Sequence, residues 1–149
     1  MTSQRTRKIV PFSADEMFDL VADVARYPEF VPHCVALRVL KAEVAAGDGK
    51  MVAEMVVAYS ALRERFKTLV TLDRANHRIE ADYLEGPFKR LHTLWRFTDA
   101  DDGSEVDFLI DFEFKNRILQ KAAAIFLEKA FGRMADAFVA RAHEIYGAA

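Results

Sequence analysis

The pattern of apolar and polar positions first marks a short helix near the N-terminus. Ser13 is a typical capping residue, and Glu16 follows it at the spacing of a capping box. Apolar residues then recur at helical spacing, and we expect the helix to end near Tyr27, because Pro28 disfavours a helical conformation in the residue before it. A second short turn is expected before Pro32, and the segment before Ser13 is expected to form a strand.

From Val35 onward, apolar positions alternate with polar ones, which is typical of strands with one buried face. Gly47 and Gly49 supply the positive backbone angles of a tight hairpin. The pattern predicts six antiparallel strands in three hairpins, at residues 35–45, 50–60, 62–74, 77–84, 89–99 and 105–115. One face of the sheet is expected to form the core, and the other is expected to face water.

The last part of the chain is predicted to form one long helix. Asn116 is a suitable N-cap, and about thirty residues that favour helices follow it. Such a helix is ~45 Å long at a rise of 1.5 Å per residue, enough to cross a whole sheet. Its apolar surface is wider than packing on one sheet face requires. This surface comprises Ile118, Leu119, Ala122, Ile125, Phe126, Leu127, Ala130, Phe131, Met134, Ala137 and Phe138.

Composition and charge narrow the class of protein. The 149 residues suit one domain, residues 1–149, and the net charge of -2 gives no global electrostatic reason to expect DNA binding. Cys34 is the single cysteine, so no internal disulfide can form. The N-terminus has no apolar core of a secretory signal, and no apolar run approaches the ~20 residues that span a bilayer. We therefore expect an intracellular, cytoplasmic protein.

No recognisable catalytic or metal-binding pattern is found. The four histidines have no zinc-like spacing with one another or with Cys34. Gly103 follows Asp101 and Asp102 in the wrong register for a calcium loop, and there is no nucleophile elbow or glycine-rich phosphate loop. We expect no catalytic residues, no metal and no covalent cofactor, and therefore a protein that is not an enzyme.

Three motifs carry a resemblance to a known family: "YPEFVPHC" at 27–34, "EGPFKRLHTLWRF" at 85–97 and "VDFLIDFEFKNRIL" at 106–119. In this order, the chain resembles the Coq10/RatA branch of the START-type superfamily, which includes polyketide cyclases, lipid-transport proteins and Bet v 1-like proteins, over about residues 5–146. The resemblance implies an α+β helix-grip fold. In that fold, a curved antiparallel sheet of about seven strands wraps around a long C-terminal helix, and two short helices follow the first strand.

The resemblance also implies a function. The expected protein binds an apolar lipid between sheet and helix, with coenzyme Q (ubiquinone), a polyprenyl quinone, as the leading candidate, and presents it to respiratory or quinone-biosynthesis enzymes. Transient contact with the inner face of the respiratory membrane would follow. One alternative is a ribosome-associated regulator that binds the large subunit and blocks subunit association, and a third is a cyclase- or aromatase-like enzyme. The basic residues available for membrane or RNA contact are Arg5, Arg7, Lys8, Arg63, Arg65 and Lys67.

The wide apolar helix and the resemblance together predict a lipid-binding cavity. The residues expected to line it are Met55, Phe66, Val70, Trp95, Phe108, Phe112, Phe126, Ala130 and Met134. The same residues are equally suited to a solid core, which is the usual place of aromatic stripes. Glu64, Thr68, His92 and Thr93 have positions from which they can point inward, and we expect them to be hydrogen-bonded residues near strand ends.

Two rigid segments are candidates for a gate at the mouth of this cavity. Proline fixes a backbone angle, so such a segment can hold apolar side chains over an opening without the entropy cost of ordering a flexible lid. The gate candidates are Tyr27, Pro28, Phe30, Val31, Pro32, Gly86, Pro87 and Phe88. A second interpretation remains open, in which these residues simply close one end of the core.

Overall fold

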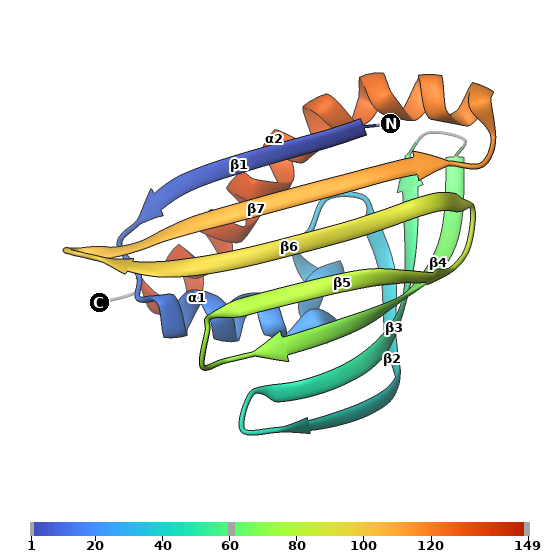
Figure 1. Ribbon diagram of the computed structural model, residues 1–149. Coiled ribbons are helices and arrows are strands. Elements are labelled where there is room, and N and C mark those ends of the chain that lie inside the picture. The colour runs from blue at the N-terminus through green and yellow to red at the C-terminus, as the bar shows by residue number, and fades with distance from the viewer. Residues whose placement is uncertain (1, 60–61, 148–149) are drawn as a thin grey trace.

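The computed structural model describes the backbone of residues 2–59 and 62–147, and the side chains of these residues except 2, 59, 62 and 122–132. Figure 1 shows the order of elements along the chain. The elements are β1 (Thr2–Val10), α1 (Ala14–Ala22), the 3-10 helix η1 (Val24–Glu29), β2 (Cys34–Ala45), β3 (Asp48–Tyr59), β4 (Leu62–Asp73), β5 (Arg78–Glu85), β6 (Phe88–Ala100), β7 (Gly103–Phe114) and α2 (Arg117–Tyr146).

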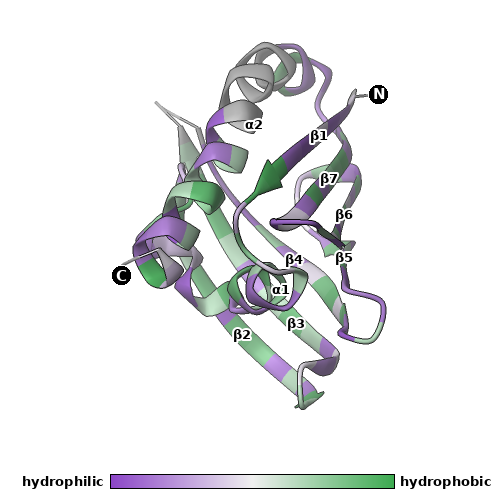
Figure 2. Ribbon diagram, turned by 90° about the vertical axis from the view of Figure 1, so that its left-hand side faces the viewer, coloured by the Kyte–Doolittle hydropathy of each residue, from purple (hydrophilic) through white to green (hydrophobic). Residues whose placement is uncertain are grey.

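The strands form one antiparallel sheet of seven strands in the order β1-β7-β6-β5-β4-β3-β2. Consecutive strands from β2 to β7 are neighbours, and β1 joins the far edge by pairing with β7, where Gln4 faces Ile110. The sheet curves, and α1 and α2 lie on its inner side (Figure 2). The expected α+β helix-grip fold is therefore confirmed, including the first strand and the two short helices after it.

Local signals explain the first helix and one error in its predicted length. The side chain of Ser13 accepts the Glu16 backbone N–H, and Glu16 in turn accepts the N–H of Ser13, which confirms the capping box. The helix α1 ends at Ala22, however, five residues before the expected end near Tyr27, because Asp23 leaves the helical region with a ψ of 67°. Pro28 lies inside the separate turn η1.

The helix α2 begins where the sequence predicts. The side-chain oxygen of Asn116 accepts the backbone N–H groups of Ile118 and Leu119 at 2.8 and 3.1 Å. Ile118, which was expected on the apolar surface, is 82% exposed. Towards the C-terminus, Ala135, Phe138 and Ala142 are buried, and they belong to the half of α2 that packs near α1 and the sheet. The other predicted apolar residues between 122 and 132 lie outside the described side chains.

The buried side chains form two clusters. The larger one joins α1, where Met17 and Phe18 are fully buried, to the middle of the sheet, where the rings of Trp95 and Phe108 stack at 4.0 Å. The smaller one lies at the end of the sheet where β7 leads into α2, and it comprises Phe88, Leu91, Phe112 and Phe114. Residues of both clusters line the cavity described next, so it lies where the two parts of the core meet.

Candidate ligand-binding cavity

The inner face of the sheet encloses a cavity of about 240 Å³. Its walls come from six strands, β2 to β7, with further contributions from β1, η1, the η1–β2 loop and α2, and most of the lining side chains are apolar. Seven of the nine residues predicted to line a lipid cavity do so: Met55, Phe66, Val70, Trp95, Phe108, Phe112 and Met134. Phe126 and Ala130 lie outside the described side chains. These residues therefore surround a cavity and do not fill a solid core, which was the alternative interpretation.

The first gate segment forms part of the cavity wall through Tyr27, Val31 and Pro32. The hydroxyl of Tyr27 donates a hydrogen bond to the carbonyl of Val21, and its ring meets that of Phe138 edge to face at 5.3 Å. Burial raises the pKa of the Tyr27 phenol, so this group stays protonated. The segment is therefore fastened to both α1 and α2.

Of the remaining gate candidates, one lines the cavity and four do not. Phe88 lines the cavity, whereas Pro28, Phe30, Gly86 and Pro87 do not. Phe30 instead packs against Phe138, with its ring centroid 5.0 Å away.

Gly86 lies close to Phe66, one of the residues that line the cavity. A Cβ added to it would lie 2.7 Å from the Cβ of Phe66, and its φ of 144° is one that other residues rarely adopt. This position therefore needs glycine so that the lining residue Phe66 can pack closely.

Sequence reasoning gave no ligand role to His33 and Cys34, which also line the cavity. His33 has a positive φ of 67°, which places this segment's backbone in the left-handed region. Burial raises the pKa of the Cys34 thiol to about 11, so a neutral, weakly reactive thiol faces the cavity at physiological pH. Neither residue stands in a motif that would have revealed this position.

Three further polar side chains lie on the cavity floor: Gln4, Thr68 and Thr93. The expectation that the two threonines are hydrogen-bonded residues near strand ends is wrong. Both lie within their strands, and across the part of the chain that the structure describes, neither hydroxyl has a hydrogen-bond partner. Thr68 is nevertheless only 9% exposed. Glu64 and His92, the other two residues considered, do not line the cavity.

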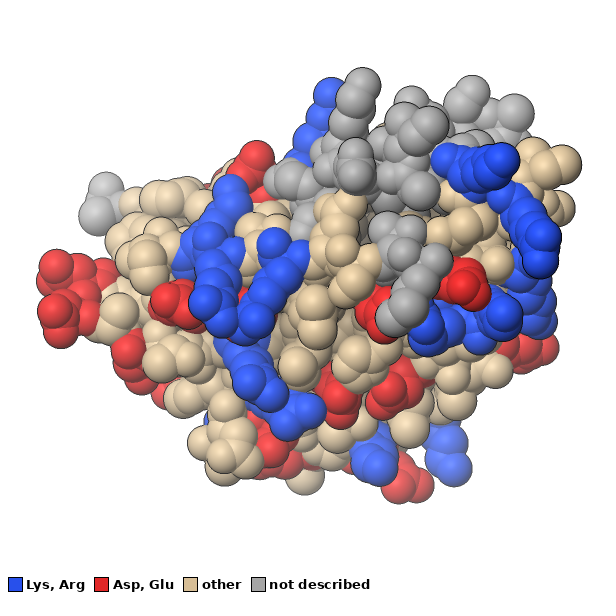
Figure 3. Space-filling model, turned by 45° about the horizontal axis from the view of Figure 1, so that its top comes forward, with Lys and Arg blue, Asp and Glu red and all other residues tan. Residues whose placement is uncertain are grey.

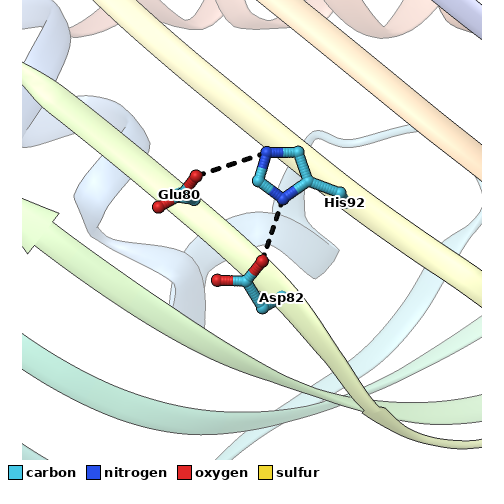
Figure 4. A group of neighbouring side chains, drawn as sticks. All are labelled: Glu80, Asp82 and His92. Atoms are coloured by element: carbon cyan, nitrogen blue, oxygen red, sulfur yellow. Dashed lines mark hydrogen bonds and ion pairs between the residues drawn. The ribbon is translucent and has the colours of Figure 1, made fainter.

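The outer face of the sheet carries a cluster that sequence reasoning did not foresee. His92 on β6 lies between Asp82, 2.9 Å from its Nδ1 atom, and Glu80, 3.3 Å from its Nε2 atom (Figure 4). One potential ligand atom from each residue lies within 4.8 Å of the other two. Since zinc binds its ligands at about 2.0–2.2 Å, these atoms would have to draw together to hold it. The observed contacts are those of a polar cluster on the surface, in which His92 bridges two carboxylates.

The basic residues near the N-terminus are largely paired with acids. Arg5 makes two hydrogen bonds to the carboxylate of Asp107, at 2.9 and 2.6 Å, and Arg7 lies 3.7 Å from the same group. These contacts hold the pKa of Asp107 below its usual range, mainly through the hydrogen bonds from Arg5. Figure 3 shows Lys and Arg side chains gathered on this face with Asp and Glu side chains among them. The face is mixed in charge and not purely basic.

Comparison with known proteins shows which family this chain belongs to. Residues 10–139 match the family described as polyketide cyclase / dehydrase and lipid transport. The chain belongs to this family. Ribosome association toxin RatA of Escherichia coli K12 is 34% identical over 141 residues, which cover 94% of this chain and 86% of that protein. The mitochondrial coenzyme Q-binding protein COQ10 homolog B of Xenopus laevis is 32% identical over 145 residues, or 94% of this chain and 57% of that protein.

A solved structure agrees with this family membership. The solution structure of an 18 kDa protein from Caulobacter crescentus is 37% identical, covers 99% of this chain and 100% of its own, and superposes with a TM-score of 0.82. The RatA and COQ10 relatives confirm the expected likeness to the Coq10/RatA branch. Within the described residues, no helix is long and apolar enough to cross a membrane.

Proposed function

We propose that this protein binds an apolar lipid, and specifically a polyprenyl quinone, in the cavity between the sheet and α2. The observation that carries the proposal is the cavity itself, which is lined by aromatic and aliphatic side chains from both core clusters. A solid core would leave no such space, because protein interiors normally pack as densely as organic crystals. The likeness to a coenzyme Q-binding protein over 94% of the chain supports the choice of ligand.

The energetics favour an apolar ligand. Burying apolar carbon contributes about 0.8 kcal/mol per methylene, so each isoprene unit would add a few kcal/mol before the cost of association and competition from the bilayer are subtracted. The cavity of about 240 Å³ is smaller than the ~300–1,000 Å³ typical of sites that enclose a whole ligand. A quinone ring and the start of its tail would fill it, and a longer tail would extend outside.

Such a carrier would collect its ligand at a membrane and present it to respiratory or quinone-biosynthesis enzymes. Tyr27, Val31 and Pro32 form the wall that would have to move or open for exchange. Arg7 and Lys8 would assist contact with anionic lipid headgroups, at about 1 kcal/mol for each basic residue near the surface. The pairing of Lys8 with Asp136 on α2 limits this contribution.

A cavity-filling variant tests the proposal. Ala81 is a small lining residue, and Ala81→Phe is expected to fill the cavity while the ligand-free protein keeps its fold. Added short-chain ubiquinone should raise the Tm of the wild type and leave that of the variant unchanged. Leu94→Phe, which adds a ring on the outer face of the adjacent strand, is the control and should respond like the wild type. Equal responses in all three proteins would contradict the proposal.

A second candidate function is association with the ribosome. The observation in its favour is the RatA likeness, which spans 94% of the chain. The surface available to RNA phosphates includes Arg7 and Arg96, which flank Asp107 in the strand register. Cosedimentation with large ribosomal subunits tests this function, and binding through phosphates should fall steeply between 50 and about 200 mM salt. Arg96→Glu should then weaken cosedimentation and leave quinone binding unchanged.

A further inference from the structure

The two threonines of the cavity occupy related positions on the sheet. Thr93 on β6 lies directly opposite Ala81 on β5, and Ala81 lies opposite Val70 on β4. Thr68 precedes Val70 by two residues on β4, so it points to the same face of the sheet. The two threonines are therefore two strands apart and offset by two residues along the strands, since Ala81 lies opposite Thr93 and Tyr83 lies opposite Thr68.

This spacing suits a flat ligand ring. Neighbouring strands lie about 4.8 Å apart, so the two threonine strands are separated by roughly 10 Å across the sheet. A six-membered ring with a carbonyl group on each of two opposite edges, hydrogen-bonded at both ends, spans a similar length. The methyl group of Ala81 leaves room for the ring above the floor, and Trp95 and Ile110 line the cavity beside it.

The unpaired hydroxyl groups are the reason to expect a polar ligand group here. Neither hydroxyl has a hydrogen-bond partner among the described residues, and both threonines line the cavity. A ligand that fills the cavity would therefore bury these hydroxyls, at a cost of about 1–3 kcal/mol each unless it supplies a hydrogen-bond partner. A valine would have the same shape and carry no such cost.

We propose that the hydroxyl groups of Thr68 and Thr93 form a pair of hydrogen-bond donors that holds the two carbonyl groups of a quinone ring over Ala81. This inference rests on the proposed lipid-binding function and adds which end of the ligand lies at this place. The ring occupies the floor of the cavity, and the apolar tail follows the remaining aromatic wall. Because a hydroxyl can also accept a hydrogen bond, the same pair holds the reduced ligand, whose ring carries hydroxyl groups.

The test compares two probes on matched variants. The probes are a ubiquinone with a short isoprenoid tail and the corresponding isoprenoid hydrocarbon, which has no oxygen. Quinone affinity is measured from quenching of Trp95, the single tryptophan and a lining residue, and hydrocarbon affinity from its competition with the quinone. The variants are Thr68→Val, Thr93→Val and their combination, with Thr68→Ser to retain the donor and Thr71→Val as a control on the outer face of β4.

Each valine variant should lower quinone affinity by roughly threefold to tenfold, and the double variant by more than tenfold, because each lost hydrogen bond has a net value of about 1 kcal/mol. Hydrocarbon affinity should stay within about twofold of the wild type by the same reasoning, and Thr68→Ser and Thr71→Val should bind the quinone normally. The inference is overturned if quinone and hydrocarbon affinities fall together, or if neither falls.

Two further results separate this inference from the proposed function. If the wild type binds the quinone and the valine variants bind it equally well, the donor pair is wrong and the lipid-binding function stands. If the wild type binds neither probe, both are wrong. Ligand-free Thr68→Val should have an unchanged or slightly higher Tm, because its hydroxyl has no partner to lose. A lower Tm would show a structural role for the hydroxyl and would overturn the inference.

Discussion

The two faces of the sheet differ in how their polar side chains are satisfied. On the outer face, acids and bases are joined in short contacts: Arg5–Asp107 at 2.6 Å, Arg90–Asp111 at 2.8 Å and Arg38–Glu54 at 3.0 Å. On the inner face, Thr68 and Thr93 face the cavity without a partner among the described residues. Most charged groups of the outer face therefore have partners within the protein, although the Nε atom of Arg90 is buried without one, whereas the two threonine hydroxyls of the inner face are left for the proposed ligand.

The largest expected effect on stability comes from removing a buried aromatic ring on the inner face of the sheet. Phe112 is 1% exposed and belongs to the smaller core cluster, so Phe112→Ala should lower the free energy of unfolding by about 3–5 kcal/mol. Leu109→Ala, on the outer face of the same strand, should cost less than about 1 kcal/mol. Urea denaturation measures both. Similar losses at the two positions would show that the inner face is not the core face.

The next largest effect is expected in the alkylation rate of Cys34, which lies on the cavity side of the sheet. Because burial raises the pKa of Cys34 to about 11, its thiolate is scarce at pH 8, and alkylation by iodoacetamide should be at least about a hundredfold slower than that of a free cysteine with a pKa of about 8.5. The rate should rise as the pH is increased towards 11. Mass spectrometry follows the reaction, and rapid alkylation at pH 7 would contradict a buried position on the cavity wall.

A smaller effect on stability is expected at Gly86, whose backbone lies against the lining residue Phe66. Gly86→Ala places a methyl group against Phe66 and requires a backbone angle that alanine rarely adopts, so we expect a loss of about 1–3 kcal/mol in the free energy of unfolding. Because Phe66 lines the cavity, quinone affinity should fall as well. A Gly86→Ala protein with wild-type stability and affinity would show that this turn does not position the wall.

The smallest effect is expected on the outer face. The folded-state pKa of Asp107 is lowered by Arg5, so its ion pair stabilises the fold above the unfolded pKa of about 3.9 and is lost as the pH falls through the folded-state value. The difference in urea midpoint between the wild type and Asp107→Asn should therefore be small at pH 7 and disappear as the pH falls through the folded-state pKa of Asp107. A difference that grows on acidification would contradict this sign.

Much of the fold follows from local signals in the sequence. Alternating apolar residues locate β2 to β7 to within a few residues of their observed bounds, and capping residues locate the start of both α-helices. The end of α1 was misplaced, because Asp23 carries no sequence signal for its non-helical angle, whereas Pro28 carries a strong one. The pairing of β1 with β7 is non-local, and the sequence predicted only that the segment before Ser13 forms a strand.

The cavity was harder to predict than the fold. An aromatic residue that lines a hollow and one that fills a core have the same spacing along a strand, so Phe108 and Phe112 do not distinguish the two cases. The roles proposed for Thr68 and Thr93 depend on the pairing of three strands, which no local pattern contains. The gate residues illustrate the same limit, because Phe30 and Tyr27 are close in sequence, yet Tyr27 lines the cavity and Phe30 packs beside it on Phe138.

Binding of a quinone on the inner face of the sheet can be tested directly. The most direct test is mass spectrometry of organic extracts from the purified wild-type protein, with the Ala81→Phe protein extracted in parallel. We expect a polyprenyl quinone at near-stoichiometric amount in the wild type and its loss from the folded variant. The absence of quinone from both extracts, together with an unchanged Tm when ubiquinone is added to the wild type, would contradict quinone binding.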